Sequence, residues 1–160
     1  MNPNFNQFKK QITNPLKFTL FTLAKLPMAF FSGLKVTHLE PNAATVSVKF
    51  KWINQNPFQS IYFAVLSMAA ELSTGVLAFA QIYKRKPSIS MLVVKLDAEF
   101  YKKAVGTIVF TCNNGTEVIK AIEETIETKQ GVTIACTSIG KDEQGVEVAK
   151  FIFTWSFKSK

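Results

Sequence analysis

The sequence is poor in cysteine and histidine, and this scarcity excludes two classes of protein. Two cysteines and one histidine among 160 residues are too few for a disulfide framework or a Cys/His zinc module. Cys112 and Cys136 lie in apolar, strand-like runs without CxxC spacing, which favours buried reduced thiols. We therefore expect a cytoplasmic protein with no metal ion and no cofactor.

Phosphate-binding and nucleic-acid-binding patterns are also missing. The chain has neither a Walker A loop nor a dinucleotide-binding GxGxxG fingerprint. Its formal net charge of +8 favours an anionic partner, and coenzyme A, nucleic acid and membrane surfaces all qualify. The basic residues are dispersed along the chain, whereas nucleic-acid binding usually shows a basic stripe with exposed aromatic residues. We expect no nucleic-acid partner.

What the chain has in abundance is apolar and aromatic side chains. Hydrophobic residues make up 48% of the sequence, charged residues only 19%, and 15 residues are Phe. This composition is typical of a folded globule and excludes a disordered chain. The length suits one domain with a core of its own. We predict a single domain over residues 1–160, with residues 1–32 forming a helical segment packed on it.

Hydrophobic periodicity predicts an α+β fold in which hairpins make the sheet antiparallel. Asn14 and Pro15 predict the start of an N-terminal helix that Pro27 interrupts. In the last strand Val146 and Val148 have the opposite parity to the apolar residues that follow, which predicts a bulge or twist near Ala149. The expected strands are 34–39, 45–52, 89–101, 105–112, 132–139 and 146–158, and the expected helices are 15–26, 60–83 and 117–129.

The segment from Ser60 to Tyr83 is apolar on nearly all sides, which is typical of a helix enclosed by other structure. It is long enough to span a bilayer, but it carries Glu71 at its midpoint. A carboxylate at the bilayer centre costs roughly 2.5–3.5 kcal/mol on insertion scales. Strand patterns also flank the segment on both sides. We predict one continuous buried helix within a soluble sheet, and no stable membrane insertion.

Glu71 is the only charged residue between Trp52 and Tyr83. A helical wheel places it on a stripe of small or polar residues, which predicts a groove along the helix. Burial in that groove would raise the pKa of the carboxyl group toward values useful for a general base or nucleophile. Alternatively, Glu71 is a structural residue that bonds to nearby backbone or faces solvent at a dimer seam. The stripe contains Ser60, Ala64, Ser67, Glu71, Thr74 and Ala78.

The segment NPFQSIYFAVLSMAAELSTG, residues 56–75, resembles the central helix of the hot-dog-fold thioesterase superfamily. In that family an Asn-containing loop precedes a Gly-Ser/Thr-Ile-Tyr start, and an Ala-Glu-Leu or Ala-Asp segment follows three turns later. The order of elements is similar over almost the whole chain, above all to an uncharacterised bacterial thioesterase-like branch. The resemblance implies a hot-dog fold, an antiparallel sheet wrapped around a long central helix.

The resemblance places Glu71 at the position of the catalytic carboxylate. It places Asn54 and Asn56 in the loop that lines the site, often from the facing subunit, although turn chemistry before Pro57 explains both residues equally well. Relatives commonly have Gly just before the helix, where a backbone N–H approaches the thioester carbonyl. Gln59 stands there in this chain and crowds that approach unless its side chain turns away.

Our first hypothesis is an acyl-CoA thioesterase that works as a homodimer, with tetramers as a further possibility. We expect a dimer because one wrapped sheet leaves an apolar edge and a half-built groove. The alternative is a non-catalytic module that holds a fatty acyl chain or another apolar ligand. A third hypothesis is a basic peripheral protein that docks on anionic membranes through the N-terminal helix.

For the thioesterase hypothesis we expect Glu71 to be the catalytic residue. We expect the substrate to contact Asn54, Asn56, Gln59, Ser60, Ser67 and Thr74, and coenzyme A phosphates to contact Lys84, Arg85, Lys102 and Lys103.

Overall fold

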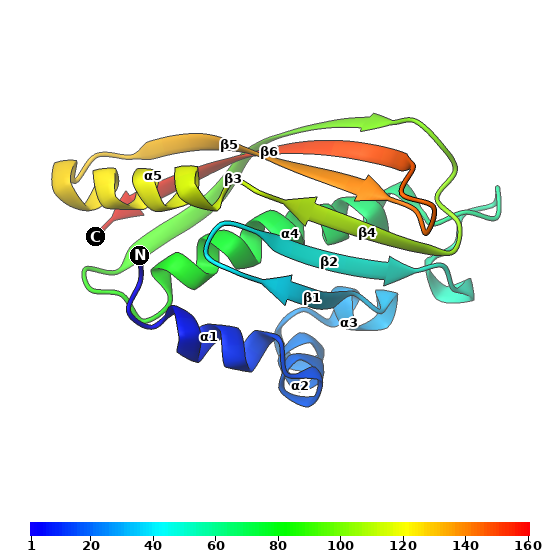
Figure 1. The fold of residues 1–160 in the computed structure, drawn as a ribbon, viewed down its shortest axis with the longest axis horizontal. Coiled ribbons are helices and arrows are strands. Elements are labelled where there is room, and N and C mark those ends of the chain that lie inside the picture. Colours follow the sequence, from blue (N-terminus) through cyan, green and yellow to red (C-terminus); the bar gives the residue numbers. More distant parts are fainter.

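A six-stranded antiparallel sheet forms the centre of the protein (Figure 1). The computed structural model describes all 160 residues, Met1–Lys160. The strands lie in the order β1-β2-β4-β5-β6-β3, so β1 and β3 are the two edges. The strands are β1 (Lys35–Leu39), β2 (Ala44–Lys49), β3 (Ile89–Phe100), β4 (Thr107–Cys112), β5 (Val132–Lys141) and β6 (Glu147–Ser159).

The sheet wraps around one long helix, α4 (Phe63–Ile82), which packs against β2, β4, β5 and β6. This arrangement confirms the predicted hot-dog fold. Helix α5 (Gly115–Thr128) contacts α4, β5 and β6. By length and composition α4 alone among the helices could span a membrane, but 61% of its apolar window is buried inside the protein. Small residues on α4, such as Ala69, Ala70 and Ser73, are buried and allow the close packing.

Helix α4 begins three residues later than predicted. Ser60, Ile61 and Tyr62 lie before the helix, because backbone groups of Ile61 and Tyr62 bond to loops and not to a helical turn. The N–H of Ile61 donates to the carbonyl of Ala104, and the N–H of Tyr62 donates to the carbonyl of Asn54. Partners that lie so far away in sequence cannot be inferred from periodicity. From Phe63 to Ile82 the helix is continuous and mostly buried, as the sequence predicted.

The N-terminal segment contains three helices where the sequence predicted one. Helix α2 (Pro15–Lys25) confirms that prediction, and the side chain of Asn14 accepts a hydrogen bond from the N–H of Lys17. Pro27 starts a further helix, α3 (Pro27–Ser32), and α1 (Phe5–Ile12) precedes both. Figure 1 shows all three at the edge of the molecule near α4 and β1, with α2 outermost.

Helix α1 was missed although its apolar residues repeat at helical spacing. Phe5, Phe8 and Ile12 form its buried face, and the Phe8 ring lies 5.3 Å from the Phe79 ring of α4. Asn2 fastens the beginning of the segment, because its side-chain amide donates to the carbonyls of Ala80 and Tyr83, each at 2.8 Å. These contacts tie α1 to the C-terminal half of α4.

Bulges in β6 and β3 set which side chains of these strands share a face, and β1 has a further bulge between Val36 and His38. The predicted bulge near Ala149 is confirmed, because Gly140 pairs with Ala149 and Lys141 pairs with Glu147, which leaves Val148 as the extra residue. A second bulge, in β3 between Val93 and Lys95, was not predicted.

The β3 bulge corrects the expected apolar face of that strand. In the sequence the even-numbered residues Leu92, Val94, Leu96, Ala98 and Phe100 are apolar, and regular alternation would place all of them on one face. In the structure Val93 pairs with the core residue Trp155, and Leu96 pairs with the core residue Phe153. Cross-strand partners share a face of the sheet, so Leu96 points to the α4 side, as does Val93, whereas Leu92 points to the opposite side.

Candidate functional site

Glu71 lies at the middle of α4, on the side covered by the N-terminal helices. Its half-buried side chain borders two adjacent apolar cavities, of about 180 and 250 Å³. Glu71, Leu72 and Leu26 line both cavities. Phe8, Ile12, Phe21 and Phe79 contribute to the first cavity, and Pro27, Ala29, Leu34 and Met68 contribute to the second. A carboxylate thus stands between two spaces suited to apolar groups.

The carboxylate of Glu71 makes no hydrogen bond and no ion pair within the chain. Desolvation by burial is the sole cause that raises the pKa of Glu71 above its ordinary 4.5. An unpaired, half-buried carboxylate costs stability. This geometry removes one structural explanation for Glu71, a hydrogen bond to nearby backbone, and it is the arrangement expected of a reactive group.

Gly75 makes room for the carboxylate one turn further along α4. A Cβ atom on Gly75 would come within 3.0 Å of Glu71 Oε1 and within 3.4 Å of Trp155 Cζ2. The carboxylate therefore lies against bare backbone. Because residues four apart in a helix share a face, the Glu71–Gly75 spacing was visible in the sequence.

Of the small and polar residues on the same stripe, Thr74 has a structural role in this chain. Its hydroxyl accepts a hydrogen bond of 3.0 Å from Trp155 Nε1 and donates to the carbonyl of Glu71 at 2.9 Å. Ser67, one turn before Glu71, is half-buried and makes no side-chain hydrogen bond. Neither Ser67 nor Thr74 lines the two cavities at Glu71, so their predicted contact with substrate stays a prediction.

Asn54 is buried away from Glu71, in the short helix η1 (Trp52–Asn54), with 2% of its surface exposed. Its amide nitrogen donates to the carbonyls of Ser32 and Lys49, and its amide oxygen accepts from the N–H of Lys51. All of these contacts are structural, because they tie the loop before α4 to β2 and α3. A role for Asn54 in substrate binding stays a prediction.

Asn56 organises the turn that leads into α4. Its side-chain oxygen accepts from the N–H of Phe58 and of Ser60, and its amide nitrogen donates to the Ser60 hydroxyl at 3.0 Å. This is the turn chemistry considered as the alternative for Asn56. Within one chain neither Asn56 nor Ser60 meets Glu71, so their predicted contact with substrate requires a second subunit.

Gln59, at the tip of this turn, has a left-handed backbone, with φ of 57°. Glycine adopts this conformation without strain, whereas other residues pay for it. The Gly that the resemblance implies at this position would therefore release backbone strain, in addition to giving a substrate access. Gln59 keeps the strained conformation.

Replacing Gln59 by Gly is expected to stabilise the protein by about 1 kcal/mol, because the left-handed strain is released. Denaturant unfolding of Gln59→Gly beside the wild-type protein measures this. The matched control is Gln144→Gly, in the β5–β6 turn, where the residue does not have positive φ. If Gln59→Gly is no more stable than wild type, the turn is not strained by Gln59.

The start of α4 offers unpaired backbone donors. The N–H groups of Phe63 and Ala64 make no backbone hydrogen bond, as expected for the first turn of a helix, and such groups can stabilise an oxyanion. Glu71 lies seven residues beyond Ala64, or about 10 Å along the helix axis. A single carbonyl group therefore cannot contact both the Glu71 carboxylate and the free N–H groups at the start of the same α4 helix.

The four predicted contacts for coenzyme A phosphates fall into two separate pairs. Lys84 and Arg85 follow the C-terminal end of α4, whereas Lys102 and Lys103 lie near its start, roughly 30 Å away for a helix of this length. Arg85 pairs with Glu123 at 2.5 Å, and Lys102 pairs with Asp142 at 2.7 Å. One coenzyme A cannot use all four.

Lys103 is the best placed of these four residues. Its ammonium group lies 3.4 Å from the carbonyl of Phe58, beside the turn that carries Gln59, and it has no carboxylate partner. Lys84 only reaches Gln7, at 3.5 Å, at the other end of α4. These positions favour Lys103 over Lys84 and Arg85 as a contact for a substrate entering near the start of α4.

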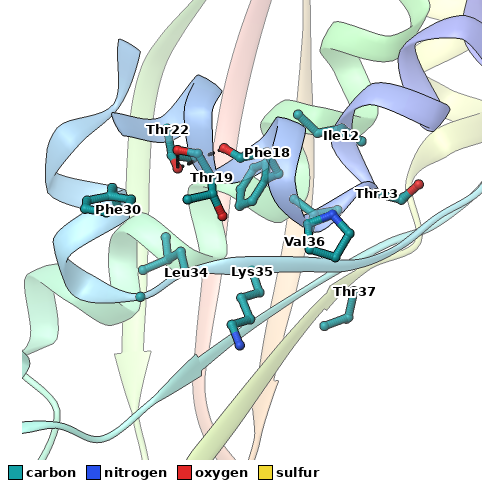
Figure 2. Close-up of a pocket in the computed structure, with 12 residues that line it drawn as sticks. Ile12, Thr13, Phe18, Thr19, Thr22, Phe30, Leu34, Lys35, Val36 and Thr37 are labelled. Carbon is teal, nitrogen blue, oxygen red and sulfur yellow. Dashed lines mark hydrogen bonds between the residues drawn. The ribbon is translucent and has the colours of Figure 1, made fainter. Parts of the chain in front are cut away.

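The largest cavity, about 490 Å³, lies apart from Glu71, between α2 and β1. Figure 2 shows Phe18, Thr19 and Thr22 of α2 on one side of it and Leu34, Lys35 and Val36 on the other. None of the predicted site residues lines this space. It falls within the size range of small-molecule sites in proteins.

The comparisons with solved structures agree with the fold. A probable thioesterase of unknown function from Pseudomonas aeruginosa superimposes with a TM-score of 0.77 at 21% identity, over 94% of this chain and 99% of that one. A thioesterase from Haemophilus influenzae gives 0.64 at 9% identity, over 88% of each chain. A variant of a Staphylococcus aureus thioesterase gives 0.65 at 12% identity, over 82% of this chain and 98% of that one.

These likenesses define the protein as one of the hot-dog fold, whose structural neighbours include thioesterases. The family described as a domain of unknown function (DUF4442) matches residues 17–157, and the chain belongs to this family. No curated protein matches the sequence significantly. The match leaves out α1, so two of the residues that line the cavity beside Glu71, Phe8 and Ile12, lie outside it.

Proposed function

We propose that the protein is a thioesterase and that it hydrolyses acyl thioesters at Glu71. The observation that carries this proposal is a half-buried carboxylate without a partner, placed between two apolar cavities. The fold is shared with thioesterases, although fold alone does not define an activity. An acyl chain suits the apolar cavities, and the net charge of +8 favours an anionic carrier such as coenzyme A.

In the proposed reaction, Glu71 acts as general base or as nucleophile. As a base it takes a proton from water, the water oxygen attacks the thioester carbonyl, and the carbon–sulfur bond breaks to release a thiol and a carboxylic acid. As a nucleophile it attacks the thioester carbonyl itself, and the carbon–sulfur bond breaks with release of the thiolate, which takes up a proton from solvent. Water then hydrolyses the resulting anhydride to the carboxylic acid and free Glu71. In both routes the negative charge on the carbonyl oxygen would be stabilised by the free N–H groups of Phe63 and Ala64 of a second subunit.

A thiol-release assay across acyl-CoA chain lengths, from acetyl to stearoyl, tests this proposal. We expect hydrolysis that depends on chain length, because the cavities beside Glu71 are of limited volume. Absence of thiol release with every chain length, from a folded protein at neutral pH, would contradict the proposed activity.

The proposed reaction centre is shared between two subunits. The 10 Å separation of Glu71 from the first turn of its own helix requires the donors to come from another chain. An apolar surface suited to a second copy lies beside that first turn, where Leu96 and Phe100 of the edge strand β3 and Phe63 of α4 are exposed. The rings of Phe63 and Phe100 lie 6.3 Å apart. An exposed apolar edge strand of this length favours pairing with another chain.

Leu96→Glu is expected to weaken the proposed homodimer at least about tenfold, because it buries an unpaired charge at the interface. Light scattering over a dilution series measures the effect. Val146→Glu is the control, since Val146 is equally exposed but lies in the β5–β6 turn. A wild-type protein that stays monomeric at micromolar concentration would contradict the dimer.

Hydrolysis is expected to rise with pH through a midpoint above 4.5, because the reactive form is the carboxylate and burial raises the pKa of Glu71. The contribution of Glu71 to the free energy of unfolding should instead fall as the pH rises. A carboxyl group whose folded-state pKa is raised contributes most below its unfolded pKa, and this contribution is lost as the pH rises through the folded value. A pH series of initial rates, with unfolding measured beside Glu71→Gln, checks both signs.

A second candidate function is non-catalytic binding of an apolar ligand. It is favoured by Gln59, whose side chain crowds the approach to a thioester carbonyl, and by the 490 Å³ cavity between α2 and β1. A binding module would need neither the donors at the start of α4 nor an unpaired carboxylate. Extraction of the purified protein and mass spectrometry of the extract distinguish the two functions. Bound lipid together with no thiol release would favour the binding module.

A further inference from the structure

The first 39 residues carry charge of only one sign. They contain five lysines and no Asp or Glu, and the first acidic residue is Glu40. Glu40 pairs with Lys9, whereas Lys10, Lys17 and Lys25 are exposed and make no ion pair. The N-terminal helices thus present uncompensated positive charge to solvent.

The same helices expose large apolar side chains. Leu16, Leu20 and Leu23 of α2 are 70%, 59% and 48% exposed, and their spacing places them on one face of the helix. We name these three residues the α2 stripe. Helix α3 follows directly and exposes Met28 and Phe31. Contiguous apolar surface of this kind marks an interaction site in a folded protein.

The α2 stripe is not needed to hold α2 on the protein. Only Phe18 and Thr22 of α2 are buried, and they line the cavity above β1. On a helical wheel these two residues lie on the side away from the stripe. Figure 1 shows α2 as the outermost of the N-terminal helices. The stripe therefore faces outward, and nothing in the chain covers it.

We propose that the α2 stripe docks on the surface of a lipid bilayer that carries anionic headgroups. The leucines would enter the boundary between headgroups and acyl chains, and the free lysines would contact the headgroups, as in interfacial amphipathic helices. Repulsion between like charges disfavours a second copy of the chain as the partner of the α2 stripe. Two copies meeting through α2 would bring Lys17, on the flank of the stripe, toward the same lysine of the other copy, and this segment has no carboxylate to pair with it.

Docking would place the bilayer beside the candidate site. Leu26, which directly follows α2, lines both cavities at Glu71. The membrane surface would then lie next to the apolar spaces of the protein, and an amphiphilic ligand could pass between them. The docking surface itself does not depend on the proposed hydrolysis, because it rests on exposed leucines and lysines alone.

Co-sedimentation with phosphatidylcholine vesicles, with and without phosphatidylglycerol, tests the proposal. The wild-type protein is expected to pellet with the anionic vesicles and to stay largely in solution with the neutral ones. The double variant Leu20→Gln, Leu23→Gln should bind anionic vesicles at least about tenfold more weakly. The control Val105→Gln, Val146→Gln changes two residues of similar exposure, 49% and 48%, and should bind as wild type does.

The lysines provide an independent readout. Lys17→Gln, on the flank of the α2 stripe, should weaken binding by about fivefold at low salt. Thermal unfolding confirms that every variant is folded before it is compared. The proposal is overturned if the wild-type protein does not pellet with anionic vesicles, or if the stripe variant and its control bind equally. It is also overturned if the stripe variant dissociates an oligomer in light scattering, because a second copy would then cover α2.

Discussion

Glu71→Gln is expected to lower thioester hydrolysis by about 10² or more, the usual scale for the loss of a general base. Gln has nearly the same shape as Glu but cannot accept a proton or attack a carbonyl. The carboxylate makes no hydrogen bond, so no network is broken by the change. The fold should therefore survive, and stability above the raised pKa of Glu71 should be equal to or greater than that of the wild type.

The control for this variant is Glu124→Gln on α5, where an exposed Glu makes no ion pair. It should leave both rate and stability unchanged. Hydrolysis and thermal stability are measured on the same preparations of the wild type and both variants. Unchanged hydrolysis with lowered stability in Glu71→Gln would end the catalytic assignment and leave Glu71 with a structural role.

Phe110→Ala is expected to destabilise the protein by about 3–5 kcal/mol, the range for removal of a fully buried Phe. Phe110 of β4 has no exposed surface, and its ring lies 5.7 Å from that of Phe151 on β6. It also lies over Gly140, where a Cβ atom would come within 2.4 Å of Phe110 Cε1. The rigid strands around the ring cannot collapse into the space that it leaves.

For a protein of this size the loss corresponds to a fall in Tm of roughly 10 °C, which calorimetry measures. Phe58→Ala serves as the control, since Phe58 is 73% exposed and its loss should cost about 0.5 kcal/mol or less. Equal melting temperatures for the two variants would show that Phe110 is not part of the core.

The fold was largely predictable because burial imposes a period on the sequence. The alternation in β2 and β6 and the apolar run of α4 each follow from contact with one core. Local interruptions of this period, such as bulges, were harder to predict from the sequence. The β3 bulge between Val93 and Lys95 depends on pairing with β6, which leaves no mark within β3. Helix α1 did carry a signal, the spacing of Phe5, Phe8 and Ile12, and it was overlooked.

The candidate site was predictable in part, for a similar reason. Glu71 was identified because an isolated charge in an apolar run is visible in the sequence, and the structure places it beside cavities. The amide partners of Asn54 were not predictable, since Ser32 lies 22 residues away. Nor could periodicity alone predict that Phe21 and Leu26 of the N-terminal segment come to line the space at Glu71.

The contact between Glu71 and Gly75 has a consequence for how this family varies. A Cβ atom on residue 75 would come within 3.0 Å of the carboxylate, so the side chains at the two positions constrain each other. A larger residue at 75 would displace the carboxylate from its place between the cavities. In an alignment, Glu at position 71 should therefore occur with Gly or another very small residue at 75. Chains with a bulky residue at 75 should have lost the acid, and with it any hydrolytic activity that depends on Glu71.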